Sequence, residues 1–116
     1  MKKLCFLVLL LTVSVMVSFA GNFITELENS IERAHKGSKI EYILHFQNGN
    51  KKIITASDFK SGNLVSYKDR PLYFELFKGR GDSKSNIMIN LTTPIYYKLD
   101  ITKVKGKWNY IFNFYY

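Results

Sequence analysis

The stretch from Ile95 to Tyr116 constrains the fold of this chain more than any other. Apolar and aromatic residues take every second position on both sides of a break at Lys105-Gly106. They are Ile95, Tyr97, Leu99 and Ile101 before the break, and Trp108, Tyr110, Phe112, Phe114 and Tyr116 after it. A period of two is typical of a β-strand with one buried face, and two such runs around a glycine predict a hairpin. So much aromatic surface predicts that this hairpin is fixed against the core.

A single amphipathic helix is expected over Asn22–His35. Its apolar residues recur at helical spacing and form one stripe, made of Phe23, Leu27, Ile31 and Ala34. Gly37 follows at a position suited to a C-terminal cap. A helix of about four turns is marginal in isolation, so the stripe needs a sheet to cover it.

The rest of the chain shows the pattern of short strands separated by turns. Ile40–Gln47 and Lys51–Thr55 flank Asn48-Gly49, the strongest short hairpin signal in the sequence. Three further strands are expected between this hairpin and the closing one, over Leu64–Tyr67, Leu72–Phe77 and Ile87–Leu91, with loops over Ala56–Asn63 and Lys78–Ser85. The predicted fold is α+β, with one N-terminal amphipathic helix packed on an antiparallel, partly curled sheet of about six or seven short strands.

The first twenty residues have the composition of a secretory signal. Lys2 and Lys3 precede the apolar run Leu4–Val17, and Ser18-Phe19-Ala20 has small residues where a signal peptidase reads. We expect cleavage after Ala20, which leaves residues 21–116 as a single small domain, secreted or periplasmic. The alternative is a retained membrane anchor, but the apolar run is shorter than the ~20 residues that a spanning helix needs.

Charge and cysteine content restrict the classes of function. The chain is basic, with a formal net charge of +8, which favours a protein or surface ligand with negative charge. Its one cysteine, Cys5, leaves with the signal, so the mature chain has no disulfide, thiol nucleophile or cysteine metal site. No cofactor is expected. Nothing resembles a nucleic-acid-binding signature, so no nucleic-acid partner is expected either.

A cationic binding site is predicted from strand order. If the strands form a simple meander, the Lys78–Ser85 loop and the Val104–Lys107 turn fall at the same end of the sheet. That end would carry six cations against Asp82, namely Lys78, Arg80, Lys84, Lys103, Lys105 and Lys107. Clustered cations attract phosphate, sulfate, carboxylate or an anionic membrane surface. The alternative is a set of solvated loop tips with no ligand.

Other motifs are weaker. Gly79–Ser83 contains Arg-Gly-Asp, the tripeptide that integrins read, although three-residue matches are frequent by chance. His35 and His45 are the two histidines, and neither has a carboxylate at a spacing typical of a metal site or a general base. Asn90-Leu91-Thr92 is a glycosylation sequon, which we take as accidental because it falls in a predicted strand.

The segment from Glu41 to Ile54, with the helix before it, resembles part of the MAP modules of extracellular adherence proteins. The most specific part is the hairpin sequence that begins at Tyr42 and continues through His45-Phe46-Gln47-Asn48-Gly49-Asn50-Lys51. The resemblance implies an exported, basic β-grasp module that binds host proteins, and some members inhibit serine proteases. The family has a strand pair before its helix, whereas here the expected helix begins at the mature N-terminus. No functional residue is carried over.

The leading hypothesis is therefore a small secreted, non-enzymatic binding module, such as an adhesin, an inhibitor or an immunity-type protein, that acts through a basic, aromatic surface. A rival is a small envelope enzyme that uses His45 and a carboxylate brought close by folding. A third hypothesis is a self-assembling envelope protein, in which Tyr96, Tyr115 and Tyr116 lie at a sheet edge that pairs with another copy.

Overall fold

The structure, a computed structural model, describes residues 23–80 and 83–116. The predicted signal peptide lies outside these residues, as does part of the Arg-Gly-Asp motif. The described elements are a helix over residues 23–35, a single 3-10 turn η1 (Ala56–Asp58), and the strands β1 (Lys39–His45), β2 (Lys51–Thr55), β3 (Ser61–Tyr67), β4 (Arg70–Arg80), β5 (Ser83–Asn90), β6 (Tyr96–Val104) and β7 (Lys107–Tyr115).

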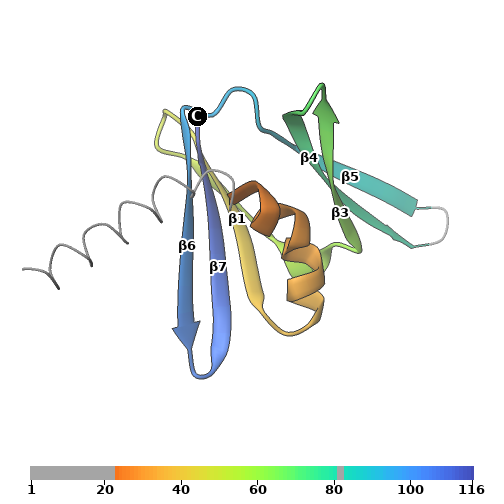
Figure 1. The fold of residues 1–116 in the computed structure, drawn as a ribbon, viewed down its shortest axis with the longest axis vertical. Helices are drawn as coiled ribbons and strands as arrows, with labels where there is room; N and C mark the ends of the chain where they lie inside the picture. The colour runs from red at the N-terminus through yellow and green to blue at the C-terminus, as the bar shows by residue number, and fades with distance from the viewer. Residues whose placement is uncertain (1–22, 81–82) are drawn as a thin grey trace, which may run out of the picture.

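These strands form two sheets, with the helix between them (Figure 1). Sheet A has the order β2-β1-β7-β6, and sheet B has the order β3-β4-β5. The α+β class is confirmed, but the prediction of one antiparallel sheet is wrong. The chain leaves sheet A after β2, builds sheet B, and returns to place β7 parallel to β1, starting from the pair Lys39 and Asn109. A local period of two identifies strands but does not identify their partners.

Both predicted hairpins are confirmed. Asn48-Gly49 joins β1 to β2, and Gly49 has the positive φ of 85° that this turn needs. Lys105 and Gly106 join β6 to β7, and both have positive φ, as in a type I′ turn. β4 and β5 extend into the region predicted as a loop, because they pair as far as Arg80 and Ser83.

The helix ends where its sequence predicts. Gly37 has φ 106°, and its N–H donates to the carbonyl of Ala34 at 3.2 Å. The N–H of Ser38 donates to the carbonyl of Arg33 at 3.0 Å. These two bonds make a Schellman cap. The predicted apolar stripe is buried along its whole length.

The two sheets and the helix share one hydrophobic core. Phe23 of the helix packs on Phe112 and Phe114 of β7, with ring centroids 5.4 and 5.6 Å apart. Tyr42 of β1 lies 5.5 Å from Phe74 of β4, so sheet A and sheet B also touch each other directly. The fully buried residues come from both sheets. The helix and the two sheets therefore bury their apolar faces against one another.

Two tyrosines hold the connection between the sheets. The Tyr116 hydroxyl donates to the carbonyl of Asn90 at 2.8 Å, and the Tyr97 hydroxyl donates to the carbonyl of Leu91. Burial raises the pKa of both tyrosines, to about 12 for Tyr116, where a charge on Tyr97 adds to the effect. Both side chains are therefore neutral donors where the chain passes from sheet B to sheet A.

Among the residues that the structure describes, no helix has the length and apolarity needed to cross a bilayer.

Candidate functional site

The β6–β7 hairpin ends in a two-stranded tip, which we define as residues 101–108. Pairing between β1 and β7 begins at Asn109, so the tip lies beyond the part of β7 that β1 supports. Figure 1 shows the β6–β7 turn reaching past the end of β1 and past the helix. The tip strands therefore pair with each other and with no third strand of sheet A.

The tip exposes large apolar side chains. Ile101, Val104 and Trp108 are 45%, 50% and 46% exposed. The alternating pattern places Ile101 and Trp108 on the buried face, and this expectation is wrong at the tip. The reason is length: the hairpin continues beyond the helix that covers the rest of this face.

The same tip is strongly basic. Lys103, Lys105 and Lys107 are all exposed, and the Lys103 ammonium lies 5.4 Å from the centre of the Trp108 ring. None of the ion pairs found among the described residues includes these three lysines. The nearest acid along β6 is Asp100, which lies 3.6 Å from Lys98. Within the part of the chain that the structure describes, the tip is thus a cationic and apolar surface without compensating acidic residues.

The six predicted site residues do not form one cluster. Lys103, Lys105 and Lys107 gather at the tip, in sheet A. Lys78 lies in β4 of sheet B, and Arg80 and Lys84 belong to the β4–β5 hairpin of the same sheet. Figure 1 shows the ends of β4 and β5 far from the β6–β7 turn. The predicted common end assumed a single meander, and the second sheet removes that assumption.

A hollow of about 570 Å³ lies between the tip and the C-terminal end of the helix. Lys105 and Lys107 line it from the tip side, with Lys39 at the start of β1. The Lys39 ammonium lies 3.4 Å from a carboxylate oxygen of Glu41, whereas neither tip lysine belongs to an ion pair between described residues. Sequence reasoning did not foresee this hollow, because the approach of the helix end to the β6–β7 turn depends on the parallel β1–β7 pairing.

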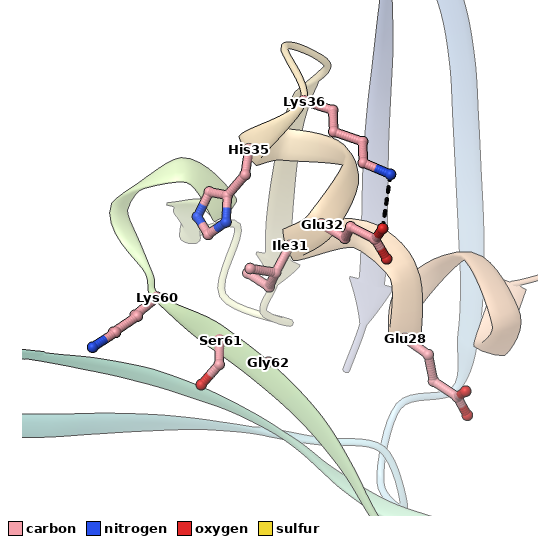
Figure 2. A pocket seen from close by; sticks show the side chains of 8 residues that line it. All are labelled: Glu28, Ile31, Glu32, His35, Lys36, Lys60, Ser61 and Gly62. Carbon is pink, nitrogen blue, oxygen red and sulfur yellow. Dashed lines mark hydrogen bonds and ion pairs between the residues drawn. The ribbon is translucent and has the colours of Figure 1, made fainter.

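A second hollow, of about 340 Å³, is lined by residues of the helix and of β3 and lies beside the contact between Ile31 and Gly62 (Figure 2). Two of its charged residues pair with each other: Lys36 donates to Glu32 at 2.8 Å, and this contact lowers the pKa of Glu32. His35 also lines the hollow, but its Nε2 is 3.0 Å from the carbonyl oxygen of Phe59 and so acts as a donor to the backbone. Packing of the helix is sufficient to explain the contacts of Lys36 and His35 in this hollow.

His45 belongs to a row of rings on the face of sheet A that lies opposite the helix. Its imidazole stacks on Tyr115, and Tyr115 stacks on Tyr96, each at a centroid distance of 4.3 Å. The register brings His45 of β1 beside Tyr115 of β7, and Tyr115 beside Tyr96 of β6. The sequence predicts both tyrosines at a sheet edge, but only Tyr96 lies in an edge strand, because β7 with Tyr115 lies between β1 and β6. The histidine was missed as their neighbour, because the parallel pairing was not foreseen.

A polar chain runs beside these rings. His45 Nε2 lies 2.8 Å from the Oδ1 of Asn113, which is only 5% exposed. The amide nitrogen of Asn113 faces oxygens, with Asp100 Oδ2 the nearest at 3.1 Å, so it is the donor end. Nε2 of His45 must then carry a hydrogen. The chain links three strands and leaves His45 Nε2 engaged by an amide, not by a carboxylate.

Within the described ranges, no group of three or more His, Cys, Asp or Glu residues is placed to hold a metal ion. Comparison with protein-family models, with curated proteins and with solved structures finds no match. The resemblance of residues 41–54 to extracellular adherence modules therefore stays a prediction. The tip is the candidate site that the geometry supports best.

Proposed function

We propose that this chain is a small non-enzymatic binding module that works outside the cytoplasm and acts through the tip of the β6–β7 hairpin. One observation carries the proposal: three lysines that belong to none of the ion pairs of the described residues share a short ribbon with three exposed apolar side chains, and this ribbon extends beyond the core. The exposed apolar side chains of such a surface lower solubility, and the surface contributes little to the stability of the fold. A ligand that covers it would gain both charge-assisted contacts and apolar burial.

The proposal is tested by capture with matched variants of the full chain. A tip variant, K103Q/K105Q/K107Q with Trp108→Ala, should lose most of what the wild-type chain retains from envelope and host extracts. The control, K51Q/K52Q/K60Q, removes the same charge from exposed lysines elsewhere. It should retain the ligand. Equal retention by all three proteins, or no retention by the wild type, would contradict the proposal.

A second candidate function, self-assembly, is favoured by the edge of sheet A. β6 is an edge strand, and the ring of Tyr96 is 54% exposed at the end of the stacked row. Strands added to a sheet lie about 4.8 Å apart, close to the 4.3 Å spacing of these rings, so an added strand can extend the row. Light scattering should then show a dimer or larger species that Tyr96→Asp disperses. A monomer at every concentration would remove this candidate.

A further inference from the structure

The tip has apolar side chains on both of its faces. In the β6–β7 register, Ile101 lies opposite Tyr110 and Lys103 lies opposite Trp108. Because side chains alternate along a strand, Ile101 and Trp108 share one face, and Val104 lies on the other. A rigid protein partner covers one face of a ribbon. A fluid interface surrounds both, so this distribution suits immersion more than docking.

The charges of the tip indicate which kind of fluid interface it would enter. Lys103, Lys105 and Lys107 flank the apolar side chains, and the range 101–108 contains no acid. Long lysine side chains extend from an immersed segment toward lipid phosphates, and tryptophan favours the headgroup level of a bilayer. The adjacent hollow, lined by Lys39, Lys105 and Lys107, offers a basic recess of about 570 Å³ beside the tip, large enough for a lipid headgroup.

We infer that the β6–β7 tip inserts into the surface of an anionic lipid bilayer. Trp108, Ile101 and Val104 enter the headgroup region, and the three tip lysines contact lipid phosphates. The inference rests on the proposed function, because it names the partner of the same site. Each lysine near an anionic surface strengthens attachment roughly fivefold at low salt, an effect that salt screens.

The experiment uses the single tryptophan of the chain as its probe. Trp108 is the only tryptophan, so its fluorescence reports on the tip and not on the apolar residues 4–17, which can associate with bilayers themselves. With vesicles of phosphatidylcholine and phosphatidylglycerol, the Trp108 emission should shift to the blue and become protected from iodide quenching. Vesicles of phosphatidylcholine alone should produce neither change, and added salt should reverse both.

Charge variants show that a changed emission shift does not result from a failure to fold. K103Q/K105Q/K107Q retains Trp108 and should need roughly a hundredfold more anionic vesicles to reach the same shift. The matched K51Q/K52Q/K60Q chain should behave as wild type, and circular dichroism should show that both fold. No emission shift with anionic vesicles would overturn the inference, as would an equal shift with both vesicle types. If extract capture still depended on the tip in that case, the proposed function would stand with a different ligand.

Discussion

Ser30 and Tyr42 form a buried polar contact between the helix and β1. Ser30 Oγ donates to the carbonyl of Leu27 at 2.6 Å, so its one hydrogen is used and the Tyr42 hydroxyl must donate to Ser30. Ser30→Ala removes the acceptor and should lower the free energy of unfolding by about 1–3 kcal/mol. Tyr42→Phe should cost less, because Ser30 keeps its bond to the backbone. Urea unfolding followed by circular dichroism measures both.

The double variant Ser30→Ala/Tyr42→Phe distinguishes the loss of a hydrogen-bond acceptor for Tyr42 from a loss of packing. With no hydroxyl left to satisfy, it should be more stable than Ser30→Ala alone. If the double variant lost as much free energy of unfolding as the two single variants together, the hydrogen bond between Ser30 and Tyr42 would not be the cause of the destabilisation.

Gly62 lies where β3 packs tightly against the helix. A Cβ at this position would meet Phe74 Cζ at 2.7 Å and Ile31 Cγ1 at 2.8 Å, both on buried side chains. Gly62→Ala should therefore lower the free energy of unfolding by about 1–3 kcal/mol through overpacking. Asn63→Ala, at the next and exposed position of β3, is the matched control and should change stability by less than about 0.5 kcal/mol. A neutral Gly62→Ala would mean that the helix can move away from β3.

At the scale of elements, the sequence predicts the structure wherever the determining residues lie close together along the chain. The helix with its Gly37 cap and both predicted hairpins follow from periodicity and turn residues. The parallel pairing of β1 with β7 depends on contacts about seventy residues apart along the chain, which no local pattern encodes. That pairing also determines where the hairpin tip becomes exposed and which residue stacks on Tyr115.

The link between the sheets should make the fold sensitive to alkali. Tyr116 has its pKa raised to about 12, and burial also raises the pKa of Tyr97, above their ordinary values near 10. A raised pKa in the folded state contributes stability that is complete below pH 10 and falls as the pH rises toward 12. Urea midpoints measured from pH 8 to pH 11.5 should therefore decrease above about pH 10.

Tyr97→Phe/Tyr116→Phe should show a shallower decrease over that range, from a lower starting stability. Tyr42 leaves a residual slope, since burial raises its pKa as well. Tyr67→Phe, at an exposed position, is the control and should follow the wild type. An unchanged slope in the double variant would contradict a role for these two hydroxyls.

At the scale of the whole molecule, the candidate site exists because the β6–β7 hairpin extends beyond the helix that covers the rest of its face. The sequence indicates that Lys103, Lys105 and Lys107 are exposed, because they lie around a turn. It does not indicate that Ile101 and Trp108 are exposed too, since their alternation matches that of the buried Tyr110 and Phe112. Exposure there depends on where the helix ends above the sheet, which is a property of tertiary packing. The separation of Lys78 from the tip lysines is likewise a consequence of the second sheet.

The shared core predicts that the two sheets unfold together. Buried side chains of sheet A, sheet B and the helix form one cluster, with Ile40 in β1 and Ile89 in β5 both within it. Ile40→Val and Ile89→Val should each lower the free energy of unfolding by about 0.5–1.5 kcal/mol. Each should also speed amide exchange in β4 and in β7 by the same factor, because both strands become exposed in one transition. Val104→Ala, at the exposed tip, should leave exchange in both sheets unchanged. If Ile89→Val accelerated exchange in β4 alone, sheet B would be an independent unit, and the contact between Tyr42 and Phe74 would not couple the sheets.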